Sequence, residues 1–211
     1  MHYYVVIIDF LNLTIEPSFP NHPTKMTEEI QILVALNDSP ASFRALDAAV
    51  KHVLSLKSKY NLYLIHFVAL NPPQNLPYLD HLDKGFNLEI QEEEDKIIDK
   101  LASKLQDKYY GKVNYSFIKV EGNGELGPII EEYIQAQLPN LDMVYVGTRN
   151  HGVLKKWALG STSDYLVHHL KAPVAVVKDN VKYLMILNHE WSLTHLLIPI
   201  ICIKEVSSTT R

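Results

Sequence analysis

Glycines and hydroxyl side chains gather in residues 147–164, in a pattern that suits the binding of a phosphate. An apolar run of strand type, residues 143–146, comes before this stretch, and a helix-like run, residues 164–170, follows it. Open α/β sheets bind ligands at such connections between a strand and a helix. Glycine allows the backbone to approach a ligand closely, and Ser161 is placed to cap the following helix, whose first amides attract anions.

The charges around this stretch also favour an anion. Five basic residues and one acid lie between positions 147 and 178, which gives a local charge of +4 in a chain whose formal net charge is -4. The basic residues are Arg149, Lys155, Lys156, Lys171 and Lys178, and the acid is Asp164.

The same stretch resembles the C-terminal signature of nucleotide-binding members of the universal stress protein family. That signature is a glycine, two residues, a glycine, nine residues, a glycine, and then serine or threonine. Three of the four positions match, and Asn150 stands in place of the second glycine; asparagine tolerates the left-handed backbone that glycine adopts there. The resemblance extends over residues 29–178, and it implies an adenine nucleotide, ATP or AMP, with or without Mg²⁺. The residues that it assigns to the phosphate loop are Gly147, Thr148, Arg149, Asn150, Gly160, Ser161 and Thr162.

A second group of expected ligand-binding residues follows the apolar run of residues 30–36, which is typical of a central strand in a parallel sheet. Ser39 is expected to cap a helix that begins at Pro40. In the family, an aspartate at the position of Asn37 contacts the nucleoside; Asn37 keeps the acceptor and loses the charge, and Asp38 could substitute for it. The resemblance thus assigns Ala35, Asn37, Asp38 and Ser39 to the site, together with the backbone of Phe67 in the next strand. A second interpretation stays open, in which Asn37 and Asp38 form a turn without a ligand.

Strand-like and helix-like segments alternate from about residue 30 to 178, which predicts an α/β fold: a doubly wound, Rossmann-like, five-stranded parallel sheet in a single domain. The expected strands are residues 30–36, 62–70, 113–120, 141–146 and 174–177. Residues 71–86 are expected to form a long connection or a lid, and a helix is predicted from Leu88 onward. Its acidic run, residues 92–95, is interpreted as a solvated face.

Residues 122–127 match the pattern G-x-G-x-x-G of dinucleotide-binding sites. Such a site needs an acid at the end of the next strand to hold the ribose. The only acid of that strand, Asp142, lies at its beginning. The pattern is therefore interpreted as a flexible turn that lines the nucleotide pocket, and His66 as a histidine of the core or the sheet edge and not as a catalyst.

Composition and length set further limits. The chain has 211 residues, of which 47% are hydrophobic, and a net charge of -4 argues against general nucleic-acid binding. Cys202 is the only cysteine, so no internal disulfide can form, which suits a cytoplasmic protein. Residues 1–27 are expected to be a disordered leader and residues 28–178 the domain. The tail, residues 179–211, is apolar but interrupted by polar residues, so no membrane span is expected.

These observations predict a regulatory protein of the stress response that binds ATP or AMP. A homodimer is expected through residues 174–177, since a final strand at a sheet edge invites pairing with another chain, although the tail could cover the same edge. Two alternatives stay open. One is a nucleotide-free interaction module, which the two asparagines favour; the other is a slow ATPase, for which neither a P-loop nor a carboxylate pair is visible.

Overall fold

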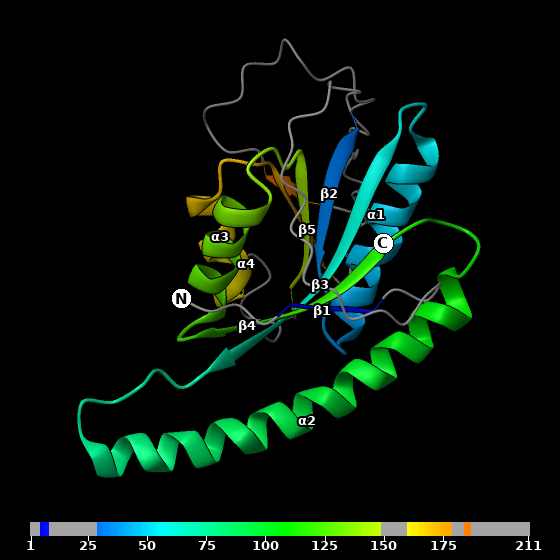
Figure 1. The fold of residues 1–211 in the computed structure, drawn as a ribbon. Helices are drawn as coiled ribbons and strands as arrows, with labels where there is room; N and C mark the ends of the chain where they lie inside the picture. Colours follow the sequence, from blue (N-terminus) through cyan, green and yellow to red (C-terminus); the bar gives the residue numbers. More distant parts are fainter. Residues whose placement is uncertain (1–4, 9–28, 149–159, 179–183, 187–211) are drawn as a thin grey trace, which may run out of the picture.

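The computed structural model describes residues 5–8, 29–148, 160–178 and 184–186, and within them a seven-stranded sheet lies between two layers of helices (Figure 1). The strand order is β1-β4-β3-β2-β5-β6-β7. The five central strands are parallel, which confirms the predicted doubly wound sheet. They are β2 (Ile30–Ala35), β3 (Tyr60–Leu70), β4 (Ser116–Asn123), β5 (Met143–Gly147) and β6 (Val174–Val177).

Both faces of the sheet are covered, which explains why the strands are apolar throughout. Alternate residues point to opposite faces: Ile32 and Val34 pack in one core cluster and Leu33 in the other, and all three are fully buried. One face is covered by α1 (Pro40–Ser55) and α2 (Pro77–Tyr109), and the other by α3 (Leu126–Gln137) and α4 (Ser161–His169). None of the helices in the described ranges is long and apolar enough to cross a membrane.

The edges of the sheet differ from the prediction. Residues 174–177 were expected to form an edge strand, but β6 is paired on both sides, because β7 (Leu184–Ile186) runs antiparallel beside it. At the other edge, β1 (Val5–Ile8), which falls within the expected disordered leader, runs antiparallel to β4. In both cases an apolar segment, β1 or β7, pairs with the backbone N–H and C=O groups that β4 or β6 would expose as an edge strand.

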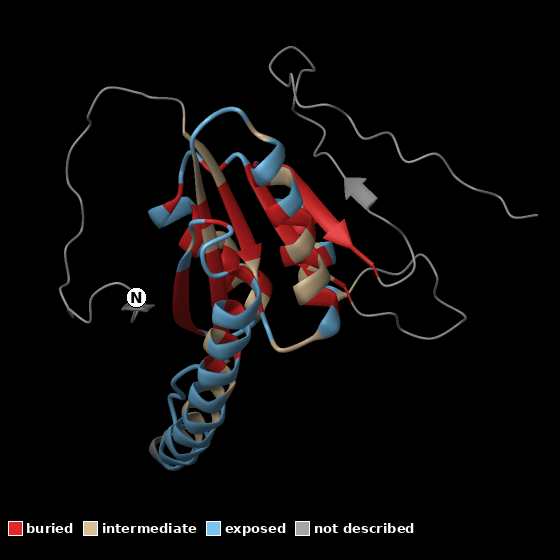
Figure 2. Cartoon of the chain, turned by 90° about the vertical axis from the view of Figure 1, so that its right-hand side faces the viewer, coloured by how far each residue is buried: buried red, intermediate tan, exposed pale blue. Residues whose placement is uncertain are grey.

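The second helix is longer than the sequence pattern predicts. It begins at Pro77 instead of Leu88, so that only residues 71–76 remain of the expected long connection. Proline suits the first position of a helix, and an ion pair between Asp80 and Lys84, 2.7 Å apart, links the first two turns. The amino-terminal half of α2 projects beyond the body of the domain and is largely exposed (Figure 2).

Candidate functional site

The candidate site lies at the carboxyl ends of β2 and β5, where the order of the strands reverses. From β2 the chain proceeds to β3 on one side, whereas β5 pairs with β2 on the other side, with Ala35 in register with Val146. Ligands of open α/β sheets bind in the crevice at such a reversal. Most of the predicted site residues that the structure describes follow these two strands.

Gly147 ends β5 against the first turn of α1. A Cβ atom at this position would lie 2.4 Å from the carbonyl carbon of Ala41 and 2.6 Å from the amide nitrogen of Ser42. Real Cβ atoms do not approach backbone atoms so closely, so only glycine lets α1 begin beside the end of β5. This contact gives Gly147 a structural role that the sequence pattern alone does not reveal.

Thr148 joins three elements of the site. Its side chain is buried, and its Oγ1 accepts a hydrogen bond of 2.9 Å from the N–H of Gly160, twelve residues later. Its own N–H donates to the carbonyl of Val177 at 3.0 Å. The predicted contact of Thr148 with the ligand stays a prediction; the geometry shows that its side chain fixes the start of α4 against the ends of β5 and β6.

Gly160, and not the predicted Ser161, is the N-cap of α4. Its carbonyl accepts the N–H of Asp164 at 2.8 Å and the hydroxyl of Ser163 at 2.9 Å, which starts the helix one residue earlier than expected. Within the described ranges, no side chain caps the first turn. Ser161 is exposed and Thr162 is half-buried, so the first turn of α4 faces the surface.

Glycine at position 160 is not required by the backbone. Its φ is -71°, which any residue can adopt, and an added Cβ would make an ordinary contact of 3.4 Å with Oγ1 of Thr148. What the glycine provides is a helix N-terminus that no side chain of the described residues caps. Such an end carries a partial positive charge and free N–H donors, and it is a ready site for a phosphate group.

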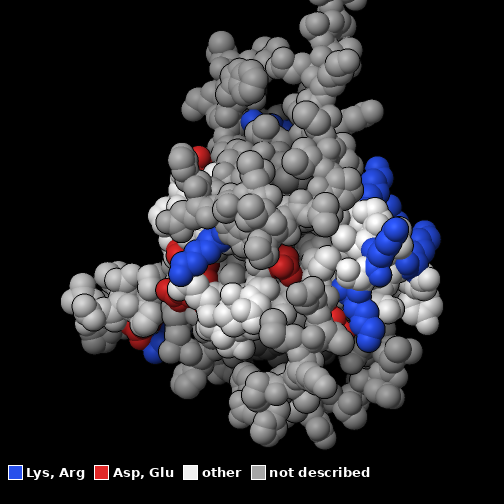
Figure 3. Space-filling view, turned by 90° about the horizontal axis from the view of Figure 1, so that it is seen from above, with Lys and Arg blue, Asp and Glu red and all other residues white. Residues whose placement is uncertain are grey.

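Two predicted site residues, Arg149 and Asn150, lie outside the described residues, as do Lys155 and Lys156. Of the remaining basic residues of this region, Lys171 is exposed and Lys178 is buried. A separate group of lysines gathers at the amino ends of the strands, around the turn from α1 to β3 (Figure 3), where Lys51, Lys57 and Lys59 are exposed.

The turn between β2 and α1 is built as its sequence predicts. Oδ1 of Asn37 accepts the N–H of Ser39 at 3.0 Å, and Oγ of Ser39 caps α1 by accepting the N–H of Ser42 at 3.2 Å. Because Oδ1 serves the turn, the donor Nδ2 is the polar group that the exposed Asn37 side chain retains for other partners. Asn37 therefore takes part in the turn and still has one polar group for a ligand, so its predicted ligand contact stays a prediction.

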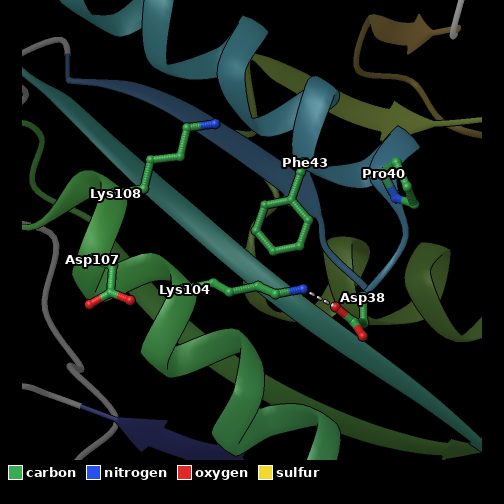
Figure 4. A pocket seen from close by; sticks show the side chains of 6 residues that line it. All are labelled: Asp38, Pro40, Phe43, Lys104, Asp107 and Lys108. Atoms are coloured by element: carbon green, nitrogen blue, oxygen red, sulfur yellow. Dashed lines mark hydrogen bonds and ion pairs between the residues drawn. The ribbon is translucent and has the colours of Figure 1, made fainter.

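Asp38 is bound by α2. Its two carboxylate oxygens accept hydrogen bonds of 2.5 Å from Nζ of Lys100 and of Lys104, and these bonds lower the pKa of Asp38. Figure 4 shows the bond to Lys104. The sequence analysis missed both lysines, although their spacing of four residues places them on one face of a helix. An open hollow of about 440 Å³ lies between α1 and α2 (Figure 4). It is lined by Asp38, Pro40, Phe43, Lys104, Asp107 and Lys108.

Phe67 contributes to the core. Its side chain is buried and packs edge-on against Tyr133 of α3, with ring centroids 5.8 Å apart. Ala35 also lies on the face of the sheet that α3 and α4 cover, where it is partly buried. The side chain of Phe67 is therefore not open to a ligand.

A polar cluster between α2 and the sheet corrects the interpretation of residues 92–95 as a purely solvated face. His66 is buried; its Nδ1 lies 2.9 Å from the carbonyl of Leu36 and its Nε2 lies 2.6 Å from Oε2 of Glu94. A carbonyl oxygen only accepts hydrogen bonds, so Nδ1 carries a proton. The short contact between Nε2 and Glu94 requires a second proton, shared by these two atoms as a hydrogen bond. Nearby, Asp95 accepts a bond of 2.6 Å from the buried Lys119. Glu92 and Glu93 are exposed, as predicted.

The glycines of the G-x-G-x-x-G pattern serve turning and packing. A Cβ at Gly122 would lie 2.8 Å from the side chain of Ile129, and one at Gly127 would lie 2.6 Å from the ring of Tyr165. Gly124 has a φ of +103°, which side chains rarely tolerate. These contacts bring α3 close to β4 and α4, and they explain the pattern without a dinucleotide.

Metal ligands do not gather in the part of the chain that the structure describes: no three His, Cys, Asp or Glu side chains there are placed to hold an ion. The arrangement offers a helix N-terminus that suits an anion and an amide donor at the neighbouring turn.

The chain matches a known protein family and resembles several solved structures. A model of the universal stress protein family matches residues 31–178. The solved structure of universal stress protein UspA from Lactobacillus plantarum is similar with a TM-score of 0.54 and 23% identity, over 70% of this chain and 97% of that one. That of the hypothetical protein MJ0577 is similar with a TM-score of 0.52 and 18% identity, over 71% of this chain and 96% of that one. An Arabidopsis thaliana family protein solved with AMP bound is 18% identical, with a TM-score of 0.45, over 72% of this chain and 92% of that one. No curated protein matches the chain.

Proposed function

The chain belongs to the universal stress protein family, and from this premise we propose that it is a regulatory protein that binds ATP or AMP at the carboxyl ends of β2 and β5. The nucleotide phosphates lie at the N-terminus of α4, and the nucleoside lies toward the turn between β2 and α1. Binding is the proposed activity, and no chemical step is assigned.

The observation that carries the proposal is the start of α4, which no side chain of the described residues caps. Gly160 caps the helix without a side chain, although neither its φ nor the space around it calls for glycine. Thr148 holds this helix end in place through its hydrogen bond to Gly160. A helix end that is fixed and lacks a side-chain cap among the described residues is suited to a phosphate, because its N–H donors need not be ordered when the ligand arrives.

The neighbouring turn supports a nucleoside. Nδ2 of Asn37 can donate to a base or ribose oxygen, whereas the aspartate expected there in the family accepts hydrogen bonds. Asp38 is already bound by two lysines, so a Mg²⁺ ion that accompanies ATP would be held through the phosphates and not through this carboxylate.

As a regulator, the protein would act through different affinities of its nucleotide-bound and nucleotide-free forms for a partner. A cytoplasmic location stays a prediction from the single cysteine. The homodimer also stays a prediction, and a pairing through β6 would require β7 to leave the edge that it occupies.

The experiment is isothermal titration of ATP and of AMP, with and without Mg²⁺, into the full chain and three variants. We expect a Kd on the order of micromolar, near 8 kcal/mol of binding free energy, which Gly160→Val abolishes and Ser161→Ala weakens. Gly160→Ala is the matched control for folding, because its methyl group fits. The absence of heat and of a thermal shift at millimolar ATP and AMP would contradict the proposal and leave a nucleotide-free member of the family.

A further inference from the structure

Large apolar side chains lie exposed on the projecting half of α2 (Figures 1 and 2). We name Tyr78, Leu79, Leu82 and Phe86 the apolar stripe; their exposed fractions are 74%, 41%, 40% and 54%. A contiguous apolar surface that remains open on a folded chain marks an interaction site more often than a single exposed residue does.

These residues share one face of the helix. Tyr78, Leu82 and Phe86 are four residues apart, and Leu79 is seven residues, close to two whole turns, before Phe86. The face toward the domain is different and polar. There, the Oδ1 of Asn87 accepts the N–H of Asn71 at 2.8 Å, and Gln91 donates to Glu121 at 2.8 Å. The stripe is thus not the surface that packs on the sheet.

The same half of the helix is strongly acidic. Seven acids and two lysines lie between Pro77 and Lys96, a net charge of -5, compared with -4 for the whole chain. The acids are Asp80, Asp83, Glu89, Glu92, Glu93, Glu94 and Asp95, and the lysines are Lys84 and Lys96.

Part of this charge is free to attract a partner. Glu89, Glu92 and Glu93 are exposed, and within the described ranges none of them forms an ion pair. Glu89 follows Phe86 by three residues, and Glu93 follows Glu89 by four, so that both continue the face of the apolar stripe. This face therefore offers apolar side chains at one end and carboxylates at the other. A partner that fits it needs an apolar surface next to basic side chains.

We propose that the apolar stripe and the adjoining Glu89 and Glu93 dock a basic amphipathic helix of another protein. The apolar face of the partner buries the stripe, and its lysines or arginines meet the two carboxylates. A second copy of this chain fits less well, because it would bring another charge of -5 to the same surface. The surface lies on α2 and shares no residue with the proposed nucleotide site.

The test measures the fluorescence anisotropy of a labelled peptide of leucine and lysine, arranged to form an amphipathic helix, on titration with the full chain. We expect saturable binding that the double change Leu82→Ser and Phe86→Ser weakens at least about tenfold, as for central apolar contacts. Glu89→Gln with Glu93→Gln should weaken binding and reduce its dependence on salt. Leu88→Ser is the matched control: Leu88 is 63% exposed but lies two residues from Phe86, about 200° around the helix, so this variant should bind as the parent does.

Circular dichroism of each variant confirms that the fold is retained. The proposal is overturned if the peptide does not bind, if the stripe variants bind it as the parent does, or if a peptide of the same composition in scrambled order binds equally well. It is also overturned in favour of a second copy if sedimentation shows a dimer of the chain that the stripe variants dissociate.

Discussion

The hydrogen bond from Gly160 to Thr148 offers a sharp test of how the candidate site is held together. Thr148→Val keeps the shape of the side chain and removes the acceptor. The N–H of Gly160 then loses its partner, and the start of α4 loses its only side-chain tie to the end of β5 among the described contacts.

The size of the effect follows from burial. Thr148 is 2% exposed, but Gly160 is half-buried and its N–H can reach water in part. We therefore take the lower end of the range for an orphaned donor, about 1 kcal/mol. For a chain of this size, that lowers the thermal midpoint by about 2–4 °C. If about 1 kcal/mol of the binding free energy of ATP is then spent on ordering the start of α4, ATP binds the variant about fivefold more weakly.

The assay combines thermal unfolding with isothermal titration of ATP. Thr148→Ser is the matched control, because it retains the hydroxyl and loses a buried methyl group worth about 0.8 kcal/mol. It should be destabilised to a similar extent but bind ATP as the parent does. Equal ATP affinity of the valine variant and the parent would refute the positioning role of Thr148.

Three further predictions follow from single contacts. Gly147→Ala should lower the thermal midpoint, since its Cβ would lie 2.4 Å from the backbone of Ala41 and overpacking costs about 1–3 kcal/mol; an unchanged midpoint would mean that α1 can shift. Gly85→Ala should raise the midpoint or the helix content, because nothing lies within 4 Å of its added Cβ and alanine favours helices by up to about 1 kcal/mol. The lysines of α2 lower the pKa of Asp38, so its ion pairs stabilise the fold above the unfolded value of 3.8 and are lost as the pH falls below it. The midpoint difference between the parent and Asp38→Asn should therefore be present at pH 7 and shrink near pH 3, and a difference independent of pH would contradict this.

The central sheet could be predicted because its signals are local. The largely apolar runs of β2 and β3 have the length of strands, and Ser39 followed by Pro40 marks the start of α1 whatever packs against it. Hydrogen bonds in the structure confirm this cap. The parallel arrangement then follows from alternation of strands and helices alone.

The features that were missed depend on partners distant in the sequence. The ion pairs of Asp38 join residues more than sixty positions apart, and the bond of His66 to Glu94 joins a strand to a helix whose start lay in a supposed loop. The spacing of Gly147 and Gly160 predicts a ligand loop but does not separate their roles. Only the distances show that the first glycine is needed for packing and that the second is not.

The most direct measurement is the amide NMR spectrum of the ¹⁵N-labelled full chain during titration with ATP. We predict that the largest shift changes occur at the amides of Ser161 and Thr162, with smaller ones at Asn37 and little change along the projecting half of α2. A spectrum that stays unchanged at millimolar ATP, or changes that gather instead around Phe43 and the hollow between α1 and α2, would contradict a phosphate site at the start of α4.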